Sequence, residues 1–372
     1  MRQRVVYVSA TDELGGADAS LFELVRSLDR ERWDPHVVVP HDGPFADRYR
    51  RMLVPVHVVP LKKLKNTRDP RWHAAWLAKA PLRVWRLLRL FARLQPDVIH
   101  VNTSVEALAG LAAAWHCRRT RCKLVWHVRE LELRPKPIER ALFGLVRRCA
   151  DRVIAISSPV AARVGPREHV YVIPNGLDLA RFAPRIAAAA PVPTIGWVGR
   201  IAPGKGLDHV IGLFARLAVE RSVRLVVMGA EVAGHGAYAA ALRAQCAAFG
   251  DRVTWLPAGP DPERAYAQLD LFVHLPDVAE GLGRTVLEAQ AAGVPVVAWP
   301  RGGLVDALQD GVTGHFAPTG DLAATAALVG ELLDDPARRA ALGRAAGAFA
   351  HERFGRERCA RAVEHVYAEA AR

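Results

Sequence analysis

Residues 270–298, DLFVHLPDVAEGLGRTVLEAQAAGVPVVA, decide the fold. The first part, DLFVHLP, is a short and nearly continuous apolar run, typical of a strand that is buried on both faces of a parallel sheet. Gly281 and Gly283 follow in a loop, a helical segment begins near Arg284, and Gly293 ends it before the apolar run VPVVA. The order of strand, loop, helix and strand predicts one βαβ unit of a doubly wound α/β domain.

Similar units extend in both directions along the chain. TIGWVGR, VRLVVMGA and RVTWLP precede this stretch, and RVVYVSA, DVIHVN, KLVWHV, DRVIAIS and HVYVIP lie nearer the start, all separated by helical patterns. The Pro- and Ala-rich run over 181–193 has no such period, so we place the linker there. We therefore expect two Rossmann-like domains, over 1–185 and 186–350, and a C-terminal helix over 351–372 that could pack back on the first domain.

The charge is divided unevenly between the two halves. The chain has 372 residues and a formal net charge of +13. Residues 1–185 contain 33 Lys and Arg against 18 Asp and Glu, whereas the remainder is slightly acidic. The first half is therefore expected to meet an anionic partner that the second half does not meet.

The compartment is indicated by what the sequence lacks. No apolar run approaches the ~18 residues that a membrane span requires, and the apolar start is too short for a signal peptide. The five cysteines have no metal-type spacing and no close pairs, which favours free thiols in a reducing compartment. We expect a cytoplasmic protein without a transmembrane segment.

The segment GWVGRIAPGKGLDHVI begins as a strand and ends as a helix. Its glycines allow backbone N–H groups to approach an anion, and Arg200 and Lys205 add positive charge beside a helix N-terminus. The segment matches neither the Walker A loop nor the dinucleotide-binding Gly-x-Gly-x-x-Gly motif. A diphosphate site and a basic surface turn both remain open for this loop taken alone.

The loop and helix after DLFVHLP carry two glutamates. Gly281 and Gly283 lie at a helix N-terminus, where an anion is favoured, and Glu280 lies on the same loop. Glu288 is one turn into the helix, where a carboxylate can accept two hydroxyl groups, as ribose recognition requires. The alternative is that both glutamates serve only the helix and its start.

These motifs together resemble a known enzyme family. EGLGRTVLEAQAAGVPVVA, with GRIAPGKG before it and IPNGLD before the linker, resembles the retaining glycosyltransferases of the GT-B fold, in particular glycosyltransferase family 4. Glu280 and Glu288 match both glutamates of the family's E-x7-E motif, and the resemblance covers nearly the whole chain. It implies two Rossmann-like domains facing each other across a cleft, the first binding the acceptor and the second the nucleotide sugar.

The resemblance also implies roles for residues of the second domain. Arg200 and Lys205 would hold the donor diphosphate, Glu288 the ribose, and Glu280 the hydroxyls of the transferred sugar. The backbone amides that would contact the donor belong to Gly281, Leu282 and Gly283.

In the first domain the resemblance points to three residues. Gly15 and Gly16 would close over the diphosphate, and His127, which ends KLVWHV, would lie next to the sugar. A histidine at a strand end is also a common structural residue. The implied catalytic residues are His127, Glu280, Arg200 and Lys205.

The implied reaction transfers a sugar from a nucleoside diphosphate to an acceptor hydroxyl with retention of configuration. Its main requirement is stabilisation of negative charge on the leaving group. No Asp-x-Asp motif or metal-type cluster is found in the sequence, so we expect neither a metal nor another cofactor, and we assign no nucleophile or general base. Asp277, Asp306 and the turn GAEVAGHG depart from the usual family pattern, which leaves the donor sugar open.

Other functions remain open. A catalytically silent GT-B subunit and a different GT-B enzyme, such as a nucleotide-sugar epimerase, are the alternatives on the same fold. A glycan phosphorylase would be expected to have a pyridoxal lysine and a much longer chain. The high isoelectric point also suggests nucleic acid, but no recognition module is found and the basic residues are interleaved with apolar ones, so we expect no nucleic-acid partner.

The basic segment over 62–94 suggests where the acceptor comes from. It mixes Lys and Arg with Trp72, Trp76 and Trp85, and its single acid is Asp69. A basic amphipathic helix with tryptophans suits an anionic bilayer surface, although such a helix can also pack on the first sheet, and Pro81 interrupts it. We expect a glycan or lipid-linked acceptor, such as a lipopolysaccharide or polysaccharide intermediate, at the cytoplasmic face of the membrane.

Overall fold

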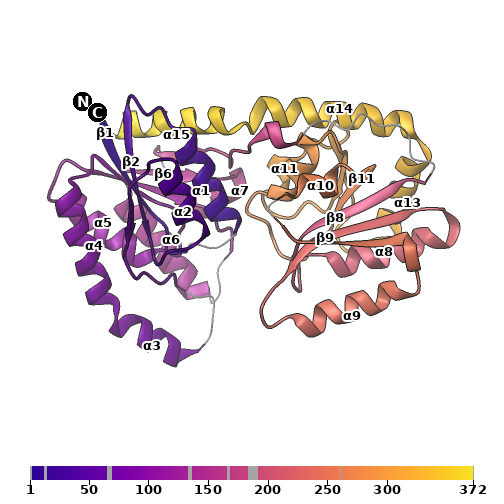
Figure 1. Ribbon diagram of the computed structural model, residues 1–372, viewed down its shortest axis with the longest axis horizontal. Helices are drawn as coiled ribbons and strands as arrows, with labels where there is room; N and C mark the ends of the chain where they lie inside the picture. Colours follow the sequence, from indigo (N-terminus) through magenta and orange to yellow (C-terminus); the bar gives the residue numbers. More distant parts are fainter. Residues whose placement is uncertain are drawn as a thin grey trace. The chain divides into compact units, whose positions relative to one another are not determined.

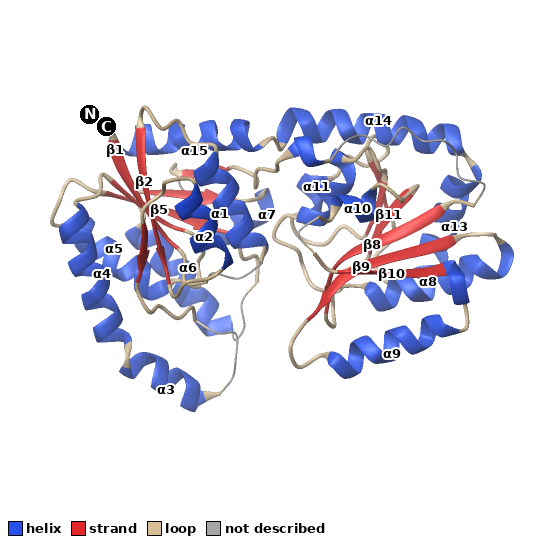
Figure 2. Ribbon diagram, in the orientation of Figure 1, coloured by secondary structure: helices blue, strands red, loops and turns tan. Residues whose placement is uncertain are grey.

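The computed structural model describes residues 2–11, 15–64, 69–132, 136–165, 168–182, 192–259 and 261–371. The chain separates into two compact units: unit 1 contains Met1–Leu177 and Arg356–Arg372, and unit 2 contains Asp178–Gly355 (Figure 1). In each unit, helices lie on both faces of a parallel sheet (Figure 2). The doubly wound α/β class predicted from the apolar runs is confirmed.

The sheet of unit 1 has the order β3-β2-β1-β4-β5-β6-β7 in the described residues, and every neighbouring pair is parallel. Its inner strands are almost wholly apolar and buried, which explains their continuous hydrophobic runs. The strands are β1 (Gln3–Val8), β2 (Trp33–Val39), β3 (Val56–Val58), β4 (Val98–Val101), β5 (Lys123–Val128), β6 (Arg152–Ala155) and β7 (Val170–Val172). The helices are α1 (Gly16–Arg26), α2 (Pro44–Arg51), α3 (Pro70–Ala78), α4 (Ala80–Leu94), α5 (Ala107–Cys117), α6 (Lys136–Cys149), α7 (Ser158–Val164) and α15 (Arg356–Ala371).

The sheet of unit 2 has the order β10-β9-β8-β11-β12-β13 in the described residues and is also parallel. The strands are β8 (Thr194–Ile201), β9 (Arg224–Glu231), β10 (Val253–Pro257), β11 (Leu271–His274), β12 (Val296–Ala298) and β13 (Gly314–Phe316). The α-helices are α8 (Leu207–Glu220), α9 (Gly236–Ala247), α10 (Glu263–Tyr266), α11 (Arg284–Ala291), α12 (Leu304–Ala307), α13 (Leu322–Asp334) and α14 (Pro336–Arg353). Two short 3-10 helices complete it, η1 (Leu179–Arg181) and η2 (Gly250–Arg252).

Each strand order reverses at one point, between β1 and β4 in unit 1 and between β8 and β11 in unit 2. The connections on the two sides of such a point leave in opposite directions, so a crevice opens at the carboxyl ends of these strands. Ligands of doubly wound sheets bind in this crevice. The loops after β8 and β11 are therefore the first place to look for a site in unit 2.

The chain joins unit 2 earlier than the Pro- and Ala-rich run suggests. The division falls after Leu177, whereas the sequence placed it after 185. The reason is that η1 and the residue after it already pack in unit 2. The ring centroids of Phe182 and Tyr266 lie 6.0 Å apart, and the Arg181 guanidinium forms an ion pair with Glu263 at 2.9 Å. Residues 183–191 of the proposed linker lie outside the described residues.

At its other end unit 2 includes α14, and α15 belongs to unit 1, so the helical stretch expected over 351–372 is divided at Gly355. Helix α15 packs on α1, β5 and β6 (Figure 1). Its side chains Cys359, Val363 and Tyr367 are part of the core beneath the sheet of unit 1. Residues more than 250 positions apart are thereby brought together.

Within the described part of the chain, no helix combines the length and the apolar character that a membrane crossing requires. The basic segment over 62–94 includes two helices, α3 and α4, and its residues 65–68 lie outside the described residues. Pro81 lies in the first turn of α4 as its missing N–H allows. All five cysteines are free, in agreement with the prediction from their spacing.

Candidate functional site

The two loops at the switch point of unit 2 are bonded to each other. The carbonyl of Gly204, after β8, accepts hydrogen bonds from the backbone N–H groups of Asp277 and Val278, after β11, at 3.1 and 3.3 Å. On its other side the β11 loop forms a parallel bridge between Glu280 and Gly302. The loop with the first glutamate is thus fixed between two neighbours, which is the rigidity that a binding loop requires.

The sequence-predicted residues Lys205 and Glu280 are brought together by these loops. Lys205 Nζ lies 2.8 Å from Glu280 Oε1, and both side chains are largely buried. Burial alone would raise the pKa of Glu280, but the charge and hydrogen bond of Lys205 and the charge of Arg200 oppose this effect, and the pKa lies below its usual value. Glu280 is therefore a carboxylate acceptor at neutral pH, and cationic side chains surround it.

A histidine that the sequence analysis did not select lies beside this pair. His274 ends β11 and is buried, and its Nε2 is 3.9 Å from Glu280 Oε1. Within the described residues neither ring nitrogen of His274 has a hydrogen-bond partner. Burial lowers the pKa of His274 to about 4, so the ring is neutral at pH 7. The signal in the sequence was a single polar residue at the carboxyl end of an apolar strand.

Two glycines are required by the close approach of the loops. Gly206 has φ +80°, and a Cβ atom there would lie 2.1 Å from the carbonyl oxygen of Leu275. A Cβ on Gly303 would lie 2.1 Å from the carbonyl oxygen of Gly281. Any side chain at either position would force the loops around Lys205 and Glu280 apart.

The second glutamate lies inside α11, as its spacing predicts. Helix α11 begins after Gly283, and Glu288 is 5% exposed. Tyr266 donates to Glu288 Oε2 at 3.0 Å, and Arg284 Nε donates to Oε1 at 2.8 Å. Each carboxylate oxygen keeps a lone pair for a further donor. The two protein donors fix the carboxylate plane, and neither was identified from the sequence.

The exposed guanidinium of Arg200 is at the end of β8, and Leu282 is buried between the glycines of the β11 loop. All the donor-site residues predicted from the sequence thus belong to unit 2 and lie on or beside its switch point: Arg200, Lys205, Glu280, Gly281, Leu282, Gly283 and Glu288.

One group in the described residues could hold a metal ion, and the sequence analysis did not find it. Ligand atoms of Asp208, His209 and Asp277 lie within 4.8 Å of one another. His209 Nε2 is 3.0 Å from both carboxylate oxygens of Asp277, so these two residues form an ion pair whenever the imidazole is protonated. Asp208 and His209 are in α8, shortly after Lys205 in sequence, and Asp277 is on the β11 loop.

The other sequence-predicted residues lie in unit 1: Gly15 and Gly16 follow β1, and His127 is on β5, the strand next to β4. Gly15 is the N-cap of α1 and Gly16 its first residue, and among the described residues no atom lies within 4 Å of the place that a Cβ on Gly16 would take. His127 is in β5 and 3% exposed, with Nδ1 at 3.3 Å from His100 and 3.4 Å from Arg129. Burial, followed by the charge of Arg129, holds the pKa of His127 well below its usual value.

Two family models match the two halves of the chain. Residues 14–181 match the model described as Glycosyltransferase Family 4, and residues 183–348 match the model described as Glycosyl transferases group 1. Together the models cover every sequence-predicted site residue.

Curated relatives cover most of the chain. A D-inositol 3-phosphate glycosyltransferase of Thermobispora bispora is 34% identical over 322 residues, which is 76% of this chain and 74% of the relative. A GDP-mannose-dependent alpha-mannosyltransferase of Mycobacterium tuberculosis is 29% identical over 350 residues, covering 86% and 85% of the two chains.

Solved structures share the fold. The crystal structure of Anabaena Alr3699/HepE in complex with UDP and glucose matches with a TM-score of 0.80 at 22% identity, over 99% of this chain and 100% of that one. A sucrose-phosphate synthase of Thermosynechococcus elongatus matches with a TM-score of 0.78 at 20% identity, over 99% of both chains. The expected GT-B fold class and the expected enzyme class are confirmed.

Proposed function

This chain belongs to glycosyltransferase family 4, and we propose that unit 2 binds a nucleoside-diphosphate sugar whose sugar is transferred, with retention and without a metal, to an acceptor hydroxyl. The observation that carries this proposal is the Lys205–Glu280 pair at the switch point between β8 and β11. A diphosphate needs cations and N–H groups, and a sugar needs an anionic acceptor for its hydroxyls. In this pair Lys205 Nζ is the cation and Glu280 Oε1 is the anionic acceptor, and the two atoms lie 2.8 Å apart.

The leaving diphosphate gains negative charge as the glycosidic bond breaks. Lys205, Arg200 and the N-terminus of α11 place positive charge on the loops that would contact it, without reorganisation during the reaction. Glu280 would accept hydroxyls of the sugar and keep Lys205 in place. These groups can supply the stabilisation that a metal supplies in other enzymes, which is why we propose metal independence.

Glu288 would hold the ribose. The carboxylate is fixed by Tyr266 and Arg284 on α10 and α11, and its remaining lone pairs can accept two adjacent hydroxyls. The names of the relatives and the solved structures mention both GDP and UDP, so the base has to be determined by measurement.

A thermal-shift screen against UDP, GDP, ADP and CMP in the presence of EDTA tests this function. We expect one nucleoside diphosphate to raise the melting temperature by several degrees, since a ligand at 100 times its Kd adds about 2.7 kcal/mol to the stability of the folded state. Stabilisation that appears only with Mg²⁺ would contradict metal independence. No stabilisation in either condition would favour the alternative of a catalytically silent GT-B subunit.

We also propose that unit 1 contacts an anionic membrane surface through α4 and its surroundings, where a lipid-linked glycan acceptor would be met. A groove of about 710 Å³ lies between α4 and β3, the edge strand of the sheet, and Trp85, Arg86, Arg89 and Arg93 line it. In the described residues these three arginines have no ion-pair partner. Leu82 and Trp85, about half exposed, add apolar surface beside them.

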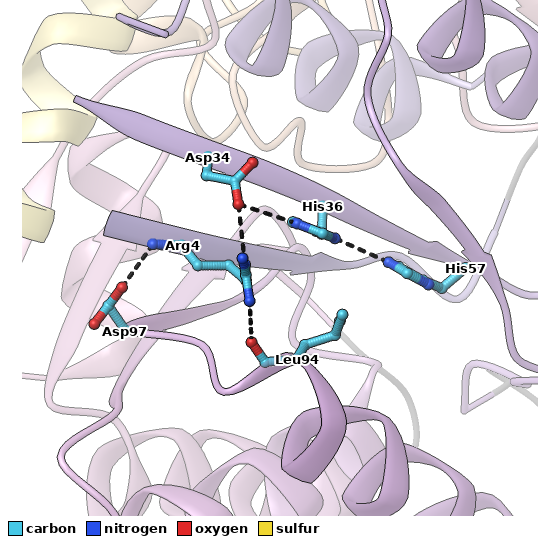
Figure 3. Close-up of polar contacts among 6 residues, drawn as sticks. All are labelled: Arg4, Asp34, His36, His57, Leu94 and Asp97. Atoms are coloured by element: carbon cyan, nitrogen blue, oxygen red, sulfur yellow. Dashed lines mark hydrogen bonds and ion pairs between the residues drawn. The ribbon is translucent and has the colours of Figure 1, made fainter. Parts of the chain in front are cut away.

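His57 also lines this groove, but the positive charge of the groove comes from the three arginines and not from this histidine. Figure 3 shows a chain of polar contacts in which Arg4 donates to Asp34 at 3.0 Å, Asp34 bonds His36 at 3.2 Å, and His36 bonds His57 at 3.0 Å. Burial, His36 and Arg93 lower the pKa of His57 to about 4. The imidazole is thus neutral at pH 7, and an anionic surface would meet the arginines.

Sedimentation with liposomes containing anionic lipid measures this contact. The variant Arg86→Gln, Arg89→Gln, Arg93→Gln is expected to lose most of its liposome binding, because each basic residue near such a surface contributes ~1 kcal/mol. The matched control is Arg118→Gln, Arg119→Gln, Arg121→Gln, which removes the same charge from exposed residues after α5. Equal loss in both variants, or no loss in the first, would contradict the proposed surface.

A further inference from the structure

A chain of buried polar contacts in unit 1 connects the C-terminal helix to His127. The hydroxyl of Tyr367, on α15, lies 2.7 Å from His100 Nδ1, and His100 Nε2 lies 3.3 Å from His127 Nδ1. The three residues come from α15, β4 and β5, and none is more than 3% exposed. Such contacts out of reach of water have only a few consistent proton arrangements.

Arg129 fixes the direction of these hydrogen bonds. Its Nη2 lies 3.4 Å from His127 Nδ1 and also donates to Asn102 Oδ1 at 2.9 Å. Nε donates to Asn102 as well, and Nη1 donates to Asn175. Burial lowers the pKa of Arg129 to about 10, so it stays charged at neutral pH, and a guanidinium has only N–H donors. Nδ1 of His127 must therefore present a lone pair.

The proton positions of the remaining groups follow from this lone pair. His100 is neutral because burial lowers its pKa to about 3, and since His127 Nδ1 accepts, the N–H of His100 is on Nε2. His100 Nδ1 is then an acceptor and receives the proton of the Tyr367 hydroxyl. Tyr367 has only this one proton, so in its second hydrogen bond, with the buried Tyr7 hydroxyl at 3.1 Å, Tyr7 is the donor. Burial raises the pKa of Tyr367 well above its usual value, so that proton is retained.

The result is an N–H group on His127 that nothing in the described residues accepts. With Nδ1 occupied and the ring neutral, the single proton of His127 is on Nε2, which is buried and has no hydrogen-bond partner there. A buried donor without a partner is rare in folded proteins, and it points to a ligand. His127 also lines a cavity of about 20 Å³ together with Arg129 and Asn175, which is space for one water-sized group.

We propose that Tyr367 of the C-terminal helix is a positioning residue that, through His100, fixes His127 as a neutral Nε2–H donor for an oxygen atom of a ligand. The identity of that ligand rests on the proposed function, in which it is a hydroxyl of the donor or acceptor sugar. His127 then orients a sugar oxygen. It cannot act as a general base, because Nε2 already carries the proton and Nδ1 faces Arg129.

Nitrogen-15 NMR of the histidine rings tests the proton positions in the full-length protein without any substrate. We expect His127 and His100 both to show a pyrrole-type Nε2 and a pyridine-type Nδ1 at neutral pH. In Tyr367→Phe, which keeps the ring that packs on Trp33, we expect His100 to lose this single form and the His127 signals to become mixed. A pyrrole-type Nδ1 on His127 of the wild type, or unchanged signals in Tyr367→Phe, would overturn the proposal.

Tyr171→Phe is the matched control, because Tyr171 also donates its hydroxyl to α15, at Glu369, but lies outside this chain of contacts. It should leave both histidines unchanged. If Tyr367→Phe fails to fold, the pair His100→Gln and His100→Leu replaces it: the glutamine keeps a donor and an acceptor and should preserve the His127 signals, whereas the leucine should not. Identical His127 signals in the two variants would overturn the proposal.

Sugar-transfer kinetics separate this inference from the proposed function. In Tyr367→Phe we expect kcat to fall about tenfold with little change in the donor KM, the effect of one weakened hydrogen bond. Expected NMR signals in a protein without transferase activity would support the proton arrangement and count against the function. Full transferase activity of Tyr367→Phe together with unchanged NMR signals would support the proposed function and count against the proton arrangement.

Discussion

Lys205→Ala is expected to lower kcat/KM for sugar transfer by about 10² to 10³, the usual cost of removing one group that stabilises developing charge. Lys205 is largely buried and its Nζ lies 2.8 Å from Glu280 Oε1, so its loss would remove the proposed diphosphate contact and release Glu280. The measurement is initial-rate kinetics with the donor found in the thermal-shift screen. Turnover at the wild-type rate would contradict the assigned role.

The same variant has a pH signature in its stability. In the wild type the pKa of Glu280 is lowered, so the pair contributes stability that is present above the unfolded pKa and is lost as pH falls through the folded pKa. In Lys205→Ala the cation that opposes the effect of burial is lost, so the pKa of Glu280 rises. The ionised form of Glu280 then destabilises the folded state. The loss in free energy of unfolding should therefore be larger at pH 7 than near pH 4, as measured by urea denaturation.

Two further variants serve as controls for this prediction. Lys205→Ala combined with Glu280→Gln should recover part of the stability at pH 7, since no unpaired carboxylate remains, and should stay inactive. Arg243→Ala breaks an ion pair with Glu231 in the same unit at 3.4 Å, between half-exposed side chains, and should change neither activity nor the pH dependence. Arg200→Ala, at an exposed site, should lose activity without losing stability.

Glu288→Gln is expected to weaken binding of the nucleoside diphosphate by roughly 10 to 10², because hydrogen bonds to a charged acceptor contribute about 1.5 to 3 kcal/mol. The glutamine side chain can still accept from Tyr266, so the fold should be kept. A sharper test compares, by isothermal titration calorimetry, the affinity for the nucleoside diphosphate with ribose and the affinity for the matching dideoxyribose nucleotide. The wild type should prefer the ribose form, and Glu288→Gln should lose that preference.

Tyr266→Phe is the companion variant, since it leaves the Glu288 carboxylate in place and removes one of the two groups that orient it. It should reduce the preference for ribose less than Glu288→Gln does. An unchanged preference for ribose in Glu288→Gln would show that another group reads the sugar and would contradict the assignment of Glu288.

The fold and the local placement of the main site residues could be predicted from the sequence. The apolar runs of β8, β11 and β12 and the glycines between them determine a strand, a loop and a helix at these places, because a parallel strand buried on both faces has almost no polar alternative. Lys205 and Glu280 could therefore be placed at strand ends, and the order of strands in doubly wound sheets brings such ends together.

The partners of these residues could not be predicted in this way. His274, Tyr266 and Arg284 are ordinary residues in their own segments, and only packing shows that they contact the two glutamates. The passage of the chain into unit 2 at Asp178 was missed for the same reason, because aromatic and ionic contacts of η1 hold residues that have no periodic signal.

The sequence by itself determined two doubly wound domains, the basic character of the first, and the family motif with Glu280 and Glu288, since each depends only on residue types and their order along the chain. Tertiary structure alone decided that Lys205 lowers the pKa of Glu280 and that Tyr367 reaches His100 from 267 positions away. Hydrogen bonds and ion pairs depend on distances of a few ångströms, and the packing of whole elements sets these distances.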